Sequence, residues 1–184
     1  MTVGGSEDID VAFRVLLNPG DEVIIPQPAF VSYEPCTIMA GGVPVTVDLK
    51  ADNGFVLTPE LLEAAITPKT KVLLLSYPNN PTGATLTFEE AAAIAKVVVK
   101  HDLVVVSDEI YTELLYEGEH VSVASLPEMA ERTILINGFS KTFAMTGWRI
   151  GYLAAPRILT EQMLKLHQYI IMTAPTVSQY AALE

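Results

Sequence analysis

The sequence predicts an α/β protein in which a doubly wound, mostly parallel sheet of about seven strands lies between helices on both faces, in three layers. Short apolar runs alternate along the chain with segments whose apolar residues recur at helical spacing. The runs at 71–76 and 103–106 are mainly apolar, which is typical of parallel strands buried on both faces. The 184 residues are enough for one domain with a sizeable core.

The expected elements follow one another in a regular order. We expect strands over 22–26, 43–49, 71–76, 103–106, 133–136 and 150–154, and helices over 7–17, 33–40, 60–66, 87–101 and from 156 onward. Residues 1–3 are expected to end a further strand. Ser6 and Thr58 are the expected N-caps of two helices, and Thr87, with a glutamate three residues later, predicts a capping box.

The composition excludes several classes of protein. A net charge of −11, with only 11 Lys and Arg residues, argues against a nucleic-acid partner, whose phosphates need a basic surface. No apolar run approaches the roughly 20 residues of a membrane-spanning helix, and the first residues lack a signal pattern. We therefore expect a cytoplasmic protein that binds neither nucleic acid nor membrane. The single cysteine, Cys36, allows no internal disulfide and is expected to be buried.

Five loops lie directly after predicted strands. They are residues 4–6, 27–30, 79–83, 108–111 and 138–141. Because the carboxyl ends of parallel strands meet at one edge of a sheet, we expect these loops to share a rim, where open α/β sheets bind their ligands.

A lysine and an arginine on this rim indicate the chemistry. Lys141 follows an apolar strand, and Arg149 comes eight residues later, before another apolar run. A lysine amine can form a Schiff base with an aldehyde, and an arginine can hold a phosphate, so the pair suggests pyridoxal 5′-phosphate (PLP). The amides of Gly5 and Ser6 would add a phosphate site at a helix start. Taken singly, the lysine and arginine could be solvated surface charges, and the glycine loop a simple turn.

Three motifs occur in order along the chain. They are Pro-Asn-Asn-Pro-Thr-Gly at 78–83, Ser-Asp-Glu-Ile-Tyr at 107–111 and Ser-Lys-Thr-Phe-Ala-Met-Thr-Gly-Trp-Arg-Ile-Gly-Tyr at 140–152. Together they resemble class I/II aminotransferases, the aspartate aminotransferase-like group of fold type I PLP enzymes. The resemblance extends over essentially all 184 residues. It implies that residues 1–184 form the cofactor-binding large domain of such an enzyme.

The resemblance implies a catalytic role for three residues. Lys141 would form the Schiff base with the cofactor and carry a proton at the substrate Cα. Asp108 would pair with the pyridine nitrogen of the cofactor, although an aspartate at this position could also cap a helix. Tyr111 would donate to the cofactor's phenolic oxygen, together with Asn80, whose Asn-Pro sequence is also a turn former.

The resemblance also implies a stacking ring and a phosphate site. Phe30 matches the aromatic ring that stacks on the cofactor, although an aromatic residue at a helix start is often part of the core. Gly5, Ser6 and Arg149 would hold the phosphate. Gly138 stands three residues before the lysine, where many relatives have a phosphate-binding serine, so one hydroxyl donor is expected to be missing.

We expect the parent enzyme to be a homodimer that moves an amino group from an L-amino acid to a 2-oxo acid. The alternatives are a PLP-dependent C–S β-lyase and the aminotransferase-like sensor domain of a transcription regulator. Relatives of this group carry an amino-terminal arm and a carboxyl-terminal small domain, for which these residues show no counterpart. We therefore expect residues 1–184 alone to turn over poorly. We assign no metal ligands.

Overall fold

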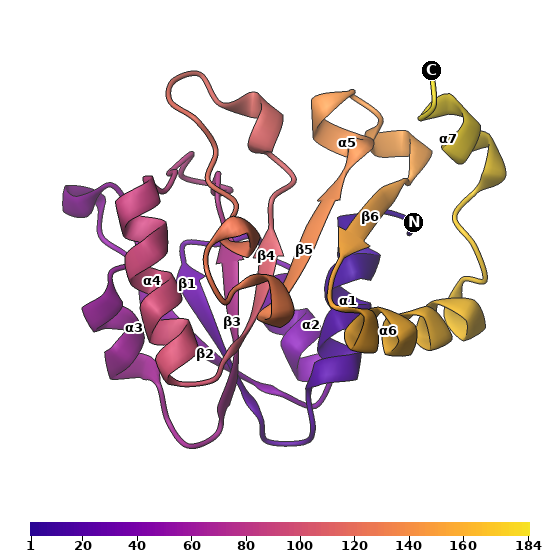
Figure 1. Ribbon diagram of the computed structural model, residues 1–184. Helices are drawn as coiled ribbons and strands as arrows, with labels where there is room; N and C mark the ends of the chain where they lie inside the picture. Colours follow the sequence, from indigo (N-terminus) through magenta and orange to yellow (C-terminus); the bar gives the residue numbers. More distant parts are fainter.

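The structure, a computed structural model, describes residues 1–184 and contains one six-stranded sheet (Figure 1). The strands are β1 (Glu22–Gln27), β2 (Val43–Asp48), β3 (Thr70–Ser76), β4 (Val104–Asp108), β5 (Thr133–Gly138) and β6 (Gly151–Ala154). Their order across the sheet is β2-β1-β3-β4-β5-β6. The first five strands are parallel, and β6 runs antiparallel to β5.

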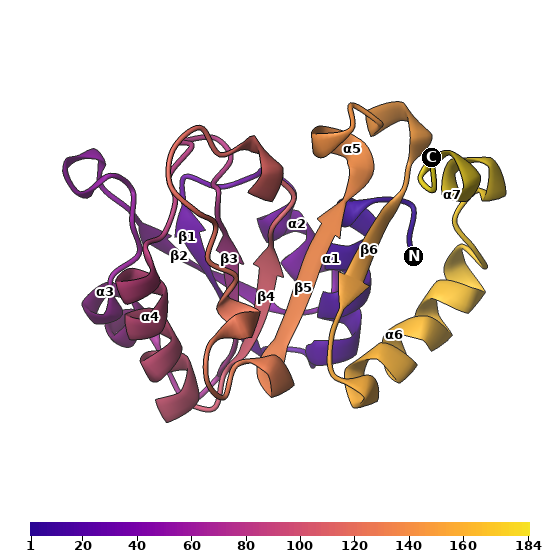
Figure 2. The same cartoon turned by 45° about the horizontal axis from the view of Figure 1, so that its top comes forward.

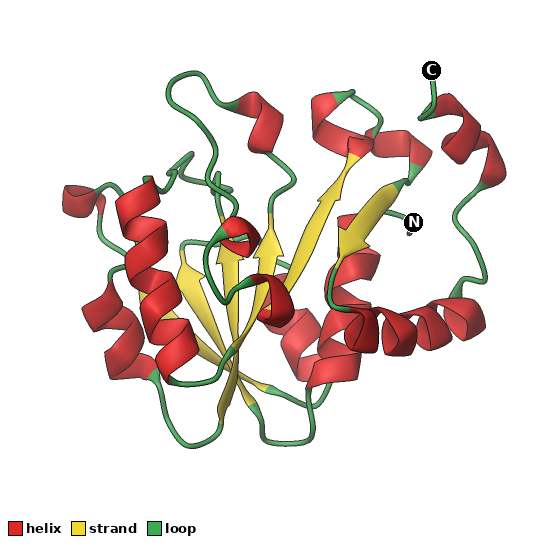
Figure 3. Cartoon of the chain, viewed as in Figure 1, coloured by secondary structure: helices red, strands yellow, loops and turns green.

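Helices cover both faces of the sheet (Figures 2 and 3). The helices are α1 (Gly5–Leu16), α2 (Tyr33–Met39), α3 (Pro59–Ala65), α4 (Phe88–Lys100), α5 (Phe139–Thr142), α6 (Arg157–Ile170) and α7 (Thr176–Ala181). Alternate residues of β3 and β4 belong to two separate cores, one shared with α1, α2 and α6 and the other with α3 and α4. This is the alternation of a strand buried on both faces. None of the helices is both long and apolar enough to cross a membrane.

The α/β class and the three-layer, mostly parallel sheet are confirmed, but the expected count of about seven strands is too high. The opening residues contribute only one antiparallel bridge, between Thr2 and Gly151. The chain leaves the sheet at once because Gly4, with φ of 107°, turns it into α1. The prediction that Cys36 is buried is confirmed.

Two of the three predicted helix caps are confirmed. The Thr58 hydroxyl accepts a hydrogen bond from a backbone amide of α3, and Thr87 forms the capping box of α4. The predicted Ser6 cap is wrong because α1 begins one residue before Ser6, with Gly4 at the N-cap. The carboxylate of Glu7 satisfies a nearby amide instead, accepting a hydrogen bond of 2.7 Å from the backbone N–H of Val3.

Three glycines let β5, β6 and the start of α1 approach one another closely. A Cβ atom on Gly151 would lie 2.9 Å from Cα of Gly4, and one on Gly138 would lie 3.0 Å from Cα of Gly151. We call these three residues the glycine stack. Because glycine has no Cβ, the three backbones can lie in direct contact. The stack therefore holds the amino end of α1 beside the carboxyl end of β5.

Helix α1 also carries a buried acid, Asp8, which is 0% exposed. Its Oδ2 atom accepts a hydrogen bond of 3.0 Å from the Thr2 hydroxyl, while Oδ1 has no partner. Burial raises the pKa of Asp8 to about 7, with a further increase from the nearby Glu7 carboxylate. The incompletely paired carboxylate of Asp8 therefore destabilises the folded protein at neutral pH.

We expect Gly151→Ala to destabilise the protein by about 1–3 kcal/mol, because the new methyl group would meet backbone atoms that cannot move aside cheaply. Urea denaturation measures this change. Gly147→Ala is the matched control, since a Cβ there meets nothing within 4 Å, and we expect a change within about 0.5 kcal/mol. Equal stability of the two variants would contradict the close contact in the glycine stack.

We expect Asp8→Asn to stabilise the protein at pH 8 and not at pH 4. The folded chain binds a proton at Asp8 with a pKa of about 7, against 3.8 in the unfolded chain. Ionisation of Asp8 therefore does not lower the free energy of unfolding below about pH 4. The loss grows between the two pKa values, is complete above about pH 7 and reaches up to about 4 kcal/mol. Denaturation at pH 4, 6 and 8 measures it, with the exposed Asp52→Asn as control. A gain that does not vary with pH would contradict the assignment.

Candidate functional site

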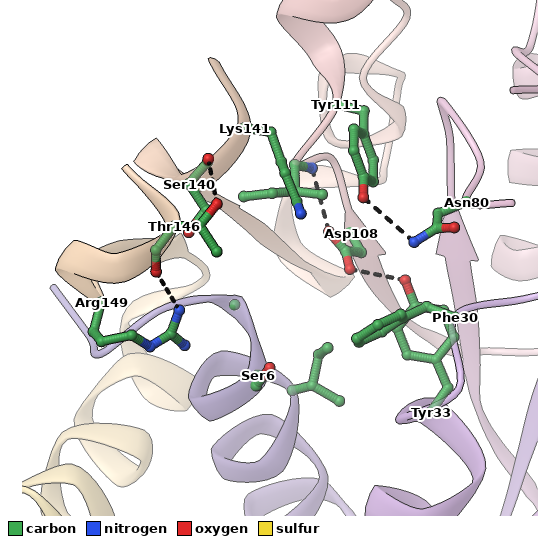
Figure 4. A pocket seen from close by; sticks show the side chains of 13 residues that line it. Ser6, Phe30, Tyr33, Asn80, Asp108, Tyr111, Ser140, Lys141, Thr146 and Arg149 are labelled. Carbon is green, nitrogen blue, oxygen red and sulfur yellow. Dashed lines mark hydrogen bonds between the residues drawn. The ribbon is translucent and has the colours of Figure 1, made fainter. Parts of the chain in front are cut away.

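All eight predicted site residues line one cavity of about 230 Å³ at the carboxyl ends of the parallel strands (Figure 4). They are Gly5, Ser6, Phe30, Asn80, Asp108, Tyr111, Lys141 and Arg149. They come from the start of α1, from the last residue of β4 and from the segments that follow β1, β3, β4 and β5, so the expected rim brings them together. The volume lies below the ~300 Å³ of typical ligand pockets, which suits a ligand with a single ring.

Asp108 ends β4 and forms the buried acid of the cavity, with 7% of its surface exposed. Its Oδ2 atom accepts a hydrogen bond of 2.8 Å from the Tyr33 hydroxyl, and Oδ1 accepts one of 3.2 Å from the amide of Ile110. Burial raises the pKa of Asp108, while these two hydrogen bonds act in the opposite direction. A carboxylate in this setting favours a cationic or protonated group beside it.

Tyr33 is a site residue that the sequence interpretation missed. It lies at the start of α2 and is 1% exposed, and burial raises its pKa well above the ordinary tyrosine value. Its hydroxyl therefore keeps its proton and remains a donor to Asp108. Its ring also packs edge-on against Phe30, with centroids 5.6 Å apart. One side chain thus orients both the acid and the aromatic wall of the cavity.

Two polar side chains of the cavity are hydrogen-bonded to each other. Asn80, in the loop after β3, donates from Nδ2 to the Tyr111 hydroxyl over 3.3 Å. Both side chains are only partly buried and line the cavity. Together they can offer hydrogen bonds to an anionic oxygen of a ligand.

Lys141 lies in α5, a single helical turn that was not predicted, directly after β5. In Figure 4 its side chain points down into the cavity, beside Tyr111 and toward Asp108. Nζ lies 5.7 Å from the centroid of the Tyr111 ring, within the range of a cation–π contact, and forms no ion pair with a carboxylate. An amine held in this way is available as a nucleophile.

The opposite end of the cavity is suited to an anion. The amides of Gly5 and Ser6 precede the first bonded amide of α1, that of Glu7, which donates to the Gly4 carbonyl. Arg149 donates from Nη1 to the Thr146 carbonyl, and its Nη2 atom lies 2.8 Å from where a Cβ of Gly4 would be. The guanidinium therefore lies directly over the start of α1. Free amides and a guanidinium together bind phosphate or carboxylate.

The absence of a serine at position 138 has a structural reason. Gly138 belongs to the glycine stack, and a Cβ there would also lie 3.2 Å from the Ile150 carbonyl oxygen. A serine here would require these neighbouring atoms to shift by a few tenths of an ångström. The hydroxyl-bearing residues that do line the cavity nearby, Ser140 and Thr146, were not predicted. The remaining lining residues are Ile9 and Ile110.

Known proteins are similar to this chain in both sequence and fold. A sequence model of the family described as "Aminotransferase class I and II" matches residues 1–184. Aromatic-amino-acid aminotransferase 2 of Thermococcus litoralis is 48% identical over 183 residues, which are 99% of this chain and 47% of the relative. Aspartate aminotransferase of Pyrococcus abyssi is 47% identical over 181 residues, or 98% of this chain and 46% of the relative.

The solved structures agree with the sequence relatives. The crystal structure of an aromatic aminotransferase from Pyrococcus horikoshii has a TM-score of 0.96 at 47% identity and covers 98% of this chain and 49% of its own. The chain spans about half the length of the curated relatives it matches. Since the family match extends over every residue and the backbone agrees closely, this chain belongs to the aminotransferase class I and II family.

Proposed function

We propose that this chain is the cofactor-binding large domain of a PLP-dependent aminotransferase, which moves an amino group from an L-amino acid to a 2-oxo acid. The observation that carries the proposal is the convergence of an unpaired amine, a buried carboxylate and an anion site around one cavity. The class I and II family generally depends on PLP. Convergence of these three groups is what such a cofactor requires.

The donor set of the cavity fits PLP. When bound, PLP supplies an aldehyde that condenses with amines and a pyridine ring that withdraws electrons. Asp108 would hold a proton on the pyridine nitrogen, because a buried carboxylate favours a cation beside it. The phosphate would lie at the start of α1, against the amides of Gly5 and Ser6 and the guanidinium of Arg149. Lys141 would bind the aldehyde carbon.

The other lining residues would orient the ring and tune its charge. Phe30 would cover one face of the ring, with its own position fixed by Tyr33. Tyr111 and Asn80 would donate to the phenolic oxygen, which favours the anionic form of that oxygen. Lys141, once freed by an incoming substrate amine, would take and return the proton at the substrate Cα.

We propose the class of reaction, transamination, and assign no particular amino acid as its substrate. Relatives at 48% and 47% identity carry the names of aromatic and aspartate aminotransferases. We propose a homodimer, supported by a series of exposed apolar side chains on α6 and α7, among them Ile158, Val177 and Tyr180. We propose a cytoplasmic location, supported by a single buried cysteine that has no disulfide partner.

We expect the chain to develop a visible absorbance band on addition of PLP, and Lys141→Ala to abolish it. The expected band is that of an imine and differs from the band of free PLP. It needs a covalent bond between the cofactor and an amine, which only Lys141 offers inside the cavity. Reduction with borohydride and peptide mass mapping should locate the label on Lys141. Lys96→Ala, on the exposed face of α4, is the control and should keep the band. A band that persists unchanged in Lys141→Ala would refute the proposal.

We expect Arg149→Ala to weaken PLP binding by about 10- to 100-fold, the usual effect of losing a charged hydrogen bond. Binding of pyridoxal, which lacks the phosphate, should change less than about twofold, because Arg149 lies at the anion end of the cavity. Titration of the absorbance band measures both. Arg157→Ala is the matched control, since Arg157 pairs with Glu161 on the surface of α6. Equal losses for PLP and pyridoxal would place the phosphate elsewhere.

A further inference from the structure

A buried carboxylate outside the cavity lies directly next to the proposed acid. Glu109 follows Asp108 in the chain, is 3% exposed and does not line the cavity. Its Oε1 atom accepts hydrogen bonds of 2.9 Å from the hydroxyls of Ser107 and Ser122. Its Oε2 atom accepts one of 2.7 Å from Nε2 of His120. A carboxylate is costly to bury, and here both of its oxygens are paired.

We propose that Glu109, His120 and Ser122 form a staple that positions Asp108 and Tyr111 toward the cavity. These three residues are positioning residues, because none of them lines the cavity. For its effect on the cofactor, this inference rests on the proposed function. For its effect on the backbone, it rests on the hydrogen bonds alone.

The alternation of a strand explains how the staple acts on Asp108. Side chains at successive positions of a strand point to opposite faces, so that of Ser107 lies on the face opposite to Asp108. The Glu109 carboxylate accepts a hydrogen bond from the Ser107 hydroxyl and therefore lies on this face too. The cores agree, since Val105 belongs to the α3 and α4 side and Val106 to the α1 and α2 side. Ser107 and Glu109, the two neighbours of Asp108, are thus held on the face opposite to the cavity by their hydrogen bond to each other and by those of Glu109 to His120 and Ser122. The aspartate side chain is therefore directed into the cavity.

The staple also closes the loop that begins with Tyr111. This loop rises above the strand ends in Figure 1, and its residue Tyr116 is 97% exposed. Glu109 lies just before the loop, and His120 and Ser122 lie at its far end, so their hydrogen bonds to Glu109 join the two ends of the loop. The amide of Glu109 further donates to the Ile136 carbonyl over 2.8 Å, which anchors the start of the loop to β5. Without the staple, Tyr111 would begin a long unanchored segment.

The chain supplies a matched control for a histidine variant. His101 also donates to a glutamate, with Nε2 2.9 Å from Oε2 of Glu63, and its side chain is 28% exposed against 20% for His120. This pair joins the end of α4 to α3 and does not line the cavity. His120→Ala and His101→Ala therefore remove the same chemical contact at two different places.

The first experiment measures amide hydrogen exchange by NMR, without any cofactor. In His120→Ala, exchange at the amides of Glu109 and Ile110 should accelerate about tenfold or more, and His101→Ala should leave it unchanged. Ser122→Ala, a milder change, should act in the same direction. His120→Gln keeps an N–H donor and should restore slow exchange. Acceleration confined to residues 120–122 would overturn the proposal.

The second experiment follows the pH titration of the visible band of the PLP-loaded chain. His120→Ala should shift the midpoint by about 0.5 pH unit or more, about a threefold change in proton affinity, because Asp108 and Tyr111 would move. His120→Gln should restore it, and His101→Ala should not shift it. An unchanged midpoint in His120→Ala would overturn the positioning role. A wild-type chain without a band would refute the proposed function, and the exchange experiment would still decide whether the staple holds the strand end.

Discussion

The direct contact of three backbone segments at Gly4, Gly138 and Gly151 is the constraint on which the geometry of the site depends. Any side chain at two of these positions would meet backbone atoms at about 3 Å. The contact brings the free amides of α1 to the end of β5, where the chain turns into the helix of Lys141. Parallel strands alone would align the loops along the rim. The glycine stack brings the anion site and the amine within reach of one small ligand.

Within this frame, the two ends of the cavity differ in charge. The chain as a whole carries a net charge of −11, so its anion site depends on local groups: the amides of Gly5 and Ser6 and the guanidinium of Arg149. At the other end, Asp108 is buried, so it favours a protonated partner. A ligand with a phosphate at one end and a basic ring nitrogen at the other matches this separation of charge.

The sequence predicted the order of the elements and the residues that meet at the rim, because both depend on local patterns. Apolar runs gave the strands, and the loops at their carboxyl ends gave the candidate residues. The contacts that fix these residues were not predictable in the same way. Tyr33 bonds to a carboxylate 75 positions away, and the glycine stack joins the beginning of the chain to two strands near residues 138 and 151. Such contacts depend on how elements pack and leave no periodic signal. The prediction that Ser6 caps a helix is wrong because the turn at Gly4 starts the helix one residue earlier than the capping pattern suggests.

The segment Ser-Asp-Glu-Ile-Tyr at 107–111 shows how one short motif can serve two faces of a sheet. Asp108 lies on the cavity side with Tyr33, while Glu109, on the other side, accepts hydrogen bonds from Ser107 and from His120 and Ser122 of the returning loop. Burial raises the pKa of Asp108, and repulsion from the neighbouring Glu109 carboxylate adds to this increase. The fold accepts this repulsion because the second carboxylate has three hydrogen-bond donors of its own and anchors the end of β4. Asp108 thus faces the cavity, and the next residue, Glu109, holds the end of the strand in place from the opposite face.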